Sequence, residues 1–182
     1  YYFVFYFYCY VYVVIFFVIL FEDLKFVFVV LHGRKKINLG RMASAGHGTY
    51  NKDISPWVLG YILGVEWEDV TVVFTDEKYK NNSKYNSYSG KYMYTAEDAS
   101  PFEALLAKLG DKVIEYESEK YKMQKMVAFS NWPTTDPFYY PEQITKFLMK
   151  CAQVDVENIK TTDAFLSGQF ASYHVYPYYP DY

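Results

Sequence analysis

The pattern of hydrophobic and polar residues divides the chain into two parts: an apolar N-terminal segment, and a longer part in which short apolar runs are separated by polar stretches. Residues 1–20 include no charged residue and no Gly, Pro or Ala, and they are mainly aromatic and β-branched. From about residue 41 onward, short apolar runs alternate with polar stretches that contain Gly, Pro, Asn and Ser. We therefore separate an apolar segment, residues 1–40, from a folded part, residues 41–182.

Three apolar runs in the folded part predict buried β-strands. They are residues 56–65 (PWVLGYILGV), 126–130 (MVAFS) and 169–175 (QFASYHV). The first run is apolar without a helical period, which is typical of a strand buried on both faces of a parallel sheet. Each run ends in a polar or aromatic cluster, so each predicted strand opens toward solvent at its C-terminal end.

Two helices are predicted between these strands. Ser100, Pro101 and Glu103 supply an N-cap, a proline in the first turn and a capping box, and apolar residues follow at helical spacing. A shorter amphipathic helix is predicted around residues 144–151. Residues 66–95 are rich in Asn, Ser, Lys and Tyr, so we expect a long loop there.

Strands that alternate with helices predict parallel βα units with their chemistry at the strand C-termini. A doubly wound sheet usually has a GxGxxG turn after a strand, and residues 33–40 (GRKKINLG) lack that spacing. A complete (β/α)8 barrel needs about 250 residues, whereas this chain has 182. The prediction is an α/β fold that forms part of a (β/α)8 TIM barrel.

Charge and composition exclude several classes of partner. The net charge is -3 and the 18 Lys and Arg are scattered, so we expect no nucleic-acid partner. Cys9 and Cys151 lie far apart and suggest no disulfide framework. His32, His47 and His174 are not spaced as a ligand pair, so we predict no metal and no cofactor.

The apolar segment leaves three interpretations open. Its length and hydropathy favour a membrane helix. Its β-branched and aromatic composition favours a pair of buried strands. Because it is built from few residue types and has few turn residues, a third interpretation is that it is not native coding sequence. A second apolar run, residues 26–31, precedes the basic residues 34–36. We expect a membrane-associated protein that contacts the membrane through residues 1–31, and the single visible flank leaves the side of the membrane open.

Glu66 is the best candidate for an acid catalyst. It follows the first predicted strand, and Trp67 places an apolar side chain beside it, which would favour the protonated form of Glu66 that a general acid needs. Trp67 is also a candidate for substrate binding. The most common form of glycoside hydrolysis needs two flanking carboxylates. Asp136 and Asp181 each follow a turn that contains Pro, where Asp is commonplace, so neither is a convincing nucleophile. The alternative is that Glu66 is a surface residue at the start of a loop.

The ends of the other two strands suggest a sugar subsite. The Asn131 amide can hydrogen-bond a hydroxyl, and the Trp132 indole can stack on the apolar face of a sugar ring. His174 and Tyr176 lie in a Tyr-rich cluster and suit the orientation of hydroxyls better than metal binding. The alternative is that Trp132 is a core residue and that Asn131 caps the following turn.

Three segments also resemble a known group of proteins. Residues 60–68 (GYILGVEWE), 128–137 (AFSNWPTTDP) and 170–181 (FASYHVYPYYPD) resemble large bacterial membrane-associated proteins that have a glycoside-hydrolase-like barrel. The resemblance spans about residues 46–182. It implies a retaining glycosidase clan whose substrate is a carbohydrate.

The resemblance also implies roles for individual residues. In this clan the fourth strand ends in a Gly-x-Glu motif whose Glu is the acid/base, and Gly64, Val65 and Glu66 are similar, although many members have Asn where Val65 stands. His174 and Tyr176 resemble side chains at the end of the sixth strand. The resemblance therefore implies a fragment with strands four to six, inactive alone, whose nucleophile follows on a seventh strand. The alternative is a non-catalytic carbohydrate-binding protein or an uncharacterised membrane protein.

Overall fold

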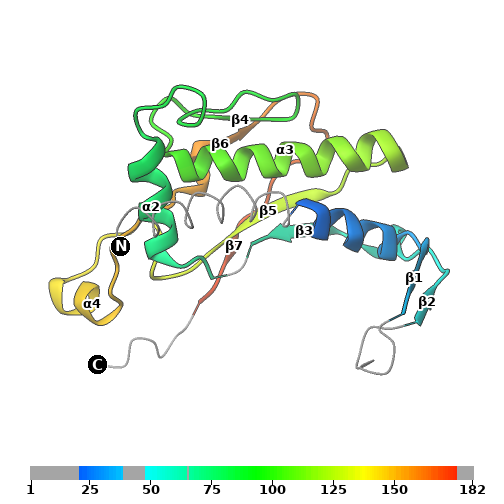
Figure 1. The fold of residues 1–182 in the computed structure, drawn as a ribbon, viewed down its shortest axis with the longest axis horizontal. Helices are drawn as coiled ribbons and strands as arrows, with labels where there is room; N and C mark the ends of the chain where they lie inside the picture. The colour runs from blue at the N-terminus through cyan, green and yellow to red at the C-terminus, as the bar shows by residue number, and fades with distance from the viewer. Residues whose placement is uncertain (1–20, 39–47, 65, 176–182) are drawn as a thin grey trace, which may run out of the picture.

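The computed structural model describes residues 21–38, 48–64 and 66–175 (Figure 1). Its strands are β1 (Lys35–Ile37), β2 (Gly48–Tyr50), β3 (Gly60–Leu63), β4 (Met93–Thr95), β5 (Met126–Asn131), β6 (Ile159–Thr161) and β7 (Ser172–Tyr173). Its helices are residues 21–31, α2 (Asp69–Tyr79), α3 (Pro101–Tyr121) and α4 (Glu142–Phe147), with 3-10 turns at Ser55–Trp57 and Val156–Asn158. This mixture of helices and strands confirms the predicted α/β class.

The central sheet is parallel and has the order β3, β5, β7. Gly60 lies opposite Met126 in one pair of strands, and Ser130 lies opposite Ser172 in the other. The spatial order of the strands follows the chain, with α2 and α3 in the first crossover and α4 in the second. The other two sheets, β1 with β2 and β4 with β6, are antiparallel pairs. Within the described residues these strands form no closed barrel.

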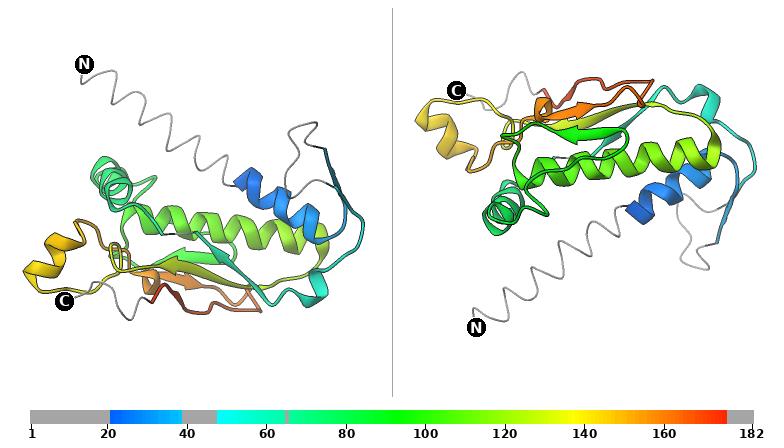
Figure 2. Two further views of the ribbon diagram at one scale, coloured as in Figure 1. Left: turned by 90° about the horizontal axis from the view of Figure 1, so that it is seen from below. Right: turned by 90° about the horizontal axis from the view of Figure 1, so that it is seen from above.

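The helices and the strands form separate layers. The helix of residues 21–31, α2 and α3 lie on one side of the strands (Figure 2). Gly110 lets α3 approach, since a Cβ there would lie 2.5 Å from the sulfur of Met93 and 2.8 Å from the ring of Phe129. Because side chains alternate along a strand, Phe129 faces α3 and Ser130 points to the opposite face of the sheet.

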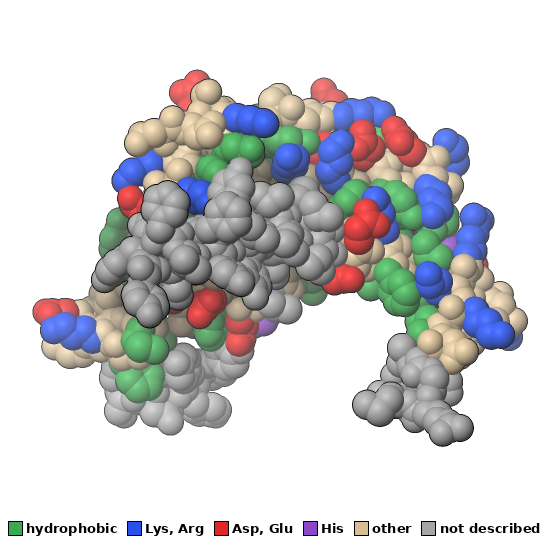
Figure 3. All heavy atoms as spheres, in the orientation of Figure 1, with side chains coloured by type: hydrophobic (Ala, Val, Ile, Leu, Met, Phe, Trp, Pro, Cys, Tyr) green, Lys and Arg blue, Asp and Glu red, His purple; other side chains and the backbone are tan. Residues whose placement is uncertain are grey.

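The predicted capping box starts α3 as expected. The Ser100 hydroxyl accepts from the Glu103 amide at 3.3 Å, and the Glu103 carboxylate accepts from the Ser100 amide at 2.8 Å. The buried Glu103 carboxylate also accepts from the Asp155 amide and the Asn158 side chain. The cap is therefore also a tertiary contact. On the solvent side of α3, acidic and basic side chains are mixed (Figure 3).

Two predictions about the first strand and the loop after it are wrong. Only Gly60–Leu63 of the expected strand is extended, and it is not buried on both faces, because Ile62 is 56% exposed. The expected loop at residues 66–95 contains α2 and β4. The β-branched start of α2 has low helix propensity, but tertiary contacts stabilise the helix: Val72 is fully buried, and the Asp76 carboxylate accepts from the Phe102 amide.

The second and third predicted strands and the second helix are found with altered bounds. The strand of residues 126–130 extends to Asn131. The strand of residues 169–175 is broken into a single bridge at Gln169 and the two residues of β7. The second helix covers only Glu142–Phe147.

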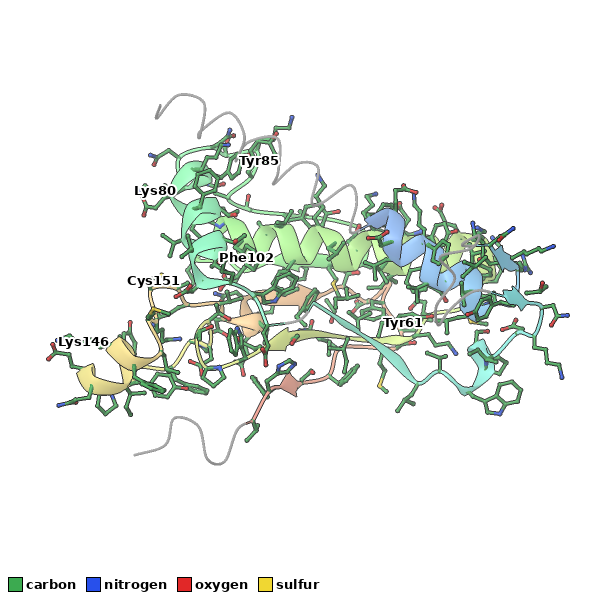
Figure 4. All side chains as sticks on the ribbon, turned by 60° about the horizontal axis from the view of Figure 1, so that its bottom comes forward. Tyr61, Lys80, Tyr85, Phe102, Lys146 and Cys151 are labelled. Carbon is green, nitrogen blue, oxygen red and sulfur yellow. The ribbon has the colours of Figure 1, made fainter. Side chains whose placement is uncertain are left out.

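Residues 21–31 form a helix that packs against β3 and α3. Phe28 is fully buried, and its ring lies 4.7 Å from the ring of Tyr61 and 5.9 Å from that of Tyr116. Figure 4 shows Tyr61 between α3 and the strands. Among the described residues, no helix has the length and apolar content that a membrane crossing requires. The apolar run of residues 1–20 lies outside the described residues.

Candidate functional site

The three strands of the central sheet bring Glu66, Ser130 and His174 together at their C-terminal ends. Glu66 follows β3 by three residues, Ser130 lies near the end of β5, and His174 directly follows β7. The Nδ1 atom of His174 lies 2.9 Å from Oε1 of Glu66, and its Nε2 atom lies 3.1 Å from Oγ of Ser130. A carboxylate, an imidazole and a hydroxyl therefore form one hydrogen-bonded chain across three strands.

The loop that positions Glu66 depends on Gly64. Gly64 has a φ of +100°, and a Cβ at this residue would lie 2.0 Å from the ring of Trp67. The Trp67 indole donates to the carbonyl of Ser130 at 3.2 Å, and the Trp132 indole donates to the carbonyl of Trp67 at 3.0 Å. These bonds attach the loop after β3 to the end of β5.

Trp67 is buried behind the site and packs against the protein interior. Its side chain is 7% exposed and lies edge-to-face with Phe102, with 5.5 Å between the ring centres. Figure 4 shows Phe102 at the interface between α3 and the strands. The structure therefore corrects the sequence-based role of Trp67, because the gap left by Gly64 draws the indole into the core.

Asn131 is also part of the scaffold. It is fully buried, and its amide donates to the Val154 carbonyl at 2.9 Å. Its Oδ1 atom accepts from the Trp132 amide at 2.9 Å and lies 3.5 Å from the Thr135 hydroxyl. Both ends of the amide are thus used within the protein, so the capping alternative describes Asn131 and the proposed bond to a sugar hydroxyl does not.

The remaining predicted residues have different positions. The backbone amide of His174 donates to the Asn131 carbonyl at 2.8 Å, which extends the pairing of β5 and β7. The side chains of His174 and Glu66 are 35% and 38% exposed, so a ligand can reach both. Trp132 is half-buried beside them. Tyr176 lies outside the described residues.

Ser130 was not among the residues singled out from the sequence. A signal for it exists in the strand period: Val127, Phe129 and Asn131 occupy one face of β5, so Ser130 must point to the other face at the functional end. Ser130 is fully buried. The alternation of side chains along β5 therefore predicts the face on which Ser130 lies. It does not predict the contact of Ser130 with His174, which follows another strand.

Asp136 forms an internal ion pair. Its Oδ1 atom lies 3.1 Å from the Lys150 ammonium, and its Oδ2 atom accepts from the Tyr140 hydroxyl. Burial, together with the neighbouring Asp136 carboxylate, raises the pKa of Tyr140. The Asp136 side chain is only 8% exposed, and its Oδ1 atom also accepts from the Phe138 amide at 3.0 Å, as an Asp in a turn does. Asp181 lies outside the described residues, and the described part contains no cluster of His, Cys, Asp or Glu that would hold a metal.

No protein-family model, curated protein or solved structure matches the chain. Function must therefore be inferred from the chemistry of the site. A partly exposed carboxylate that is hydrogen-bonded to an imidazole can exchange protons with a bound substrate, which is the basis of general acid–base catalysis.

Proposed function

We propose that the chain is part of a glycoside-hydrolase-like (β/α)8 barrel, in which Glu66 is the general acid/base of retaining glycoside hydrolysis. The observation that supports this most is the 2.9 Å contact between the Glu66 carboxylate and His174, two partly exposed groups at the C-terminal end of a parallel sheet. That end is where barrel enzymes hold their catalytic groups.

The arrangement of the strands supports the barrel part of the proposal. Consecutive strands of a barrel are neighbours in space, as β3, β5 and β7 are here. The helices of the first crossover, α2 and α3, lie on one side of these strands (Figure 2), as helices do on the outside of a barrel. Ser130 and His174 then lie on the face that would line the barrel interior.

The chemistry requires more than Glu66. In retaining hydrolysis, the acid protonates the leaving oxygen while a second carboxylate, about 5 to 5.5 Å away, attacks the sugar. Asp136 is held by Lys150 and Tyr140, so we assign no nucleophile among the described residues. In this proposal His174 orients the Glu66 carboxylate, and Trp132 borders the subsite.

Glu66→Gln tests the acid role, with Glu68→Gln as the matched control two residues away. In the protein that contains the complete barrel, acting on an aryl glycoside with a poor leaving group, we expect Glu66→Gln to lower hydrolysis by about 10²- to 10⁴-fold, because the leaving oxygen is no longer protonated. On a dinitrophenyl glycoside, which needs no such protonation, we expect the cleavage step to be largely retained. Equal losses on both substrates would contradict the acid role.

One observation favours a second candidate, a carbohydrate-binding protein without hydrolytic activity. Glu66 has no second carboxylate assigned to it among the described residues, since Asp136 is engaged elsewhere. Titration of a panel of oligosaccharides into the ¹⁵N-labelled chain separates the two candidates. Binding that survives Glu66→Gln, with no hydrolysis by the unaltered protein, would support the binding function.

A further inference from the structure

Both nitrogens of the His174 ring are hydrogen-bonded, and the chemistry of the partners determines where the proton lies. When the Glu66 carboxylate is ionised it can only accept, so in that state Nδ1 bears the proton of the 2.9 Å bond to Glu66. In a neutral imidazole the other nitrogen is then an acceptor. At 3.1 Å from Nε2, the Ser130 hydroxyl is placed to donate to it.

The order carboxylate, imidazole, hydroxyl is also that of the triad in acyl-transfer enzymes. A nucleophilic serine has to reach its substrate, however, and Ser130 is fully buried. It lies in β5, the middle strand, and pairs with Ser172 of β7. A hydroxyl enclosed in this way can orient an imidazole but cannot attack an ester.

We propose that Ser130 is a positioning residue, which bonds to Nε2 of His174, prevents the ring from turning over and so keeps Nδ1–H directed at the Glu66 carboxylate. Its effect on catalysis rests on the proposed glycosidase function, whereas its effect on the ring does not. Without the hydroxyl, the ring can turn over and present Nε2–H to Glu66 in place of Nδ1–H, so the direction of the N–H at the carboxylate is no longer fixed.

The test is ¹⁵N NMR of the His174 ring in the whole chain at neutral pH without sugar. We expect a protonated Nδ1 and an unprotonated Nε2 in the unaltered protein. Ser130→Ala is expected to reduce this asymmetry, because a ring that can turn over also presents Nε2–H to Glu66, whereas Ser130→Thr, which keeps the hydroxyl and is favoured in strands, is expected to retain it. Ser172→Ala on the paired strand is the matched control, and amide spectra show whether each variant is folded.

A charged ring or a protonated Nε2 in the unaltered protein would overturn the proposal, and so would an unchanged tautomer in folded Ser130→Ala. Labelling of Ser130 by a fluorophosphonate would instead identify it as a nucleophile. If hydrolysis is observed, Ser130→Ala should lower kcat by about 10- to 100-fold with little change in KM, because orientation is lost. If the NMR results are as expected but the protein hydrolyses no glycoside, Ser130 keeps its positioning role and only the proposed function is refuted.

Discussion

Gly64 shows how much of the site depends on a single residue. Its positive φ turns the chain after β3, and its missing side chain leaves room for the Trp67 ring. Trp67 in turn bonds to the end of β5, close to Ser130. The direction of the Glu66 side chain therefore depends on Gly64, a residue that has no side chain.

Gly64→Ala should destabilise the protein for two reasons. The left-handed conformation costs an Ala roughly 1 to 2 kcal/mol, and the new Cβ would lie 2.0 Å from the Trp67 ring, which must move. We expect a total loss of about 3 kcal/mol or more in the free energy of unfolding, measured by urea denaturation.

Gly168→Ala is the matched control for this substitution. Gly168 has a φ of +77°, but an added Cβ there would meet no atom within 4 Å. It should therefore show the cost of the backbone conformation without the crowding. Equal losses in the two variants would mean that the packing of Trp67 against residue 64 contributes nothing.

At the scale of elements, local signals were predictable from the sequence and tertiary ones were not. The start of α3 was correct because Ser100, Pro101 and Glu103 act on the adjacent backbone. The helix α2 was missed because its buried Val72 and its bond from Asp76 to α3 come from the rest of the fold. Predicting these contacts requires knowledge of which elements meet.

The candidate site follows the same division. Glu66 and His174 were predictable because each lies where an apolar run ends, and parallel strands end at the same edge. The pairing of His174 with Ser130 was not, because it depends on the register of β5 against β7. The inward turn of Trp67 was missed too, since an indole beside a glycine gives no local signal of its direction.

Glu103 allows the local and tertiary parts of one cap to be separated. Ser100→Ala removes only the N-cap hydroxyl and should cost about 1 kcal/mol. Glu103→Ala also removes the acceptor for the half-buried donors of Asp155 and Asn158, which then lose this partner. We expect a loss of roughly 3 kcal/mol or more in urea denaturation. If the two variants lose the same stability, the contact with residues 155–158 does not stabilise the fold.

At the scale of the whole molecule, a buried histidine joins the N-terminal helix to the rest of the protein. His32 is 4% exposed and stacks on Tyr121, with 3.4 Å between the ring centres. Its Nε2 atom lies 3.3 Å from the Glu117 carboxylate, and its Nδ1 atom lies 3.5 Å from that of Asp53. Burial raises the pKa of Glu117, and His32 opposes that effect in part.

The raised pKa of Glu117 makes the stability of the protein depend on pH. A raised pKa means that the folded protein favours the protonated form of Glu117. The resulting stabilisation is fully present below the ordinary pKa of 4.5 and is lost as the pH rises through the raised value. The stability of the unaltered protein relative to Glu117→Gln should therefore fall as the pH rises above 4.5.

Thermal unfolding of both proteins across this pH range measures the effect. For one group the relative free energy can change by at most about 1.4 kcal/mol per pH unit. Glu119→Gln, at an exposed position of the same helix, should show no comparable trend. A relative stability of Glu117→Gln that is constant or has the opposite trend would show that the burial of this carboxylate does not govern the pH response.

The order of the strands also sets the side-chain length that is needed at position 66. Glu66 and His174 follow β3 and β7, which are the two outer neighbours of β5. Adjacent strands are about 4.8 Å apart, so the two backbones are separated by roughly 10 Å. The side chains must close that gap to 2.9 Å. Position 66 thus has to supply length as well as charge, and an aspartate, one methylene shorter, would leave the imidazole across the sheet without its carboxylate.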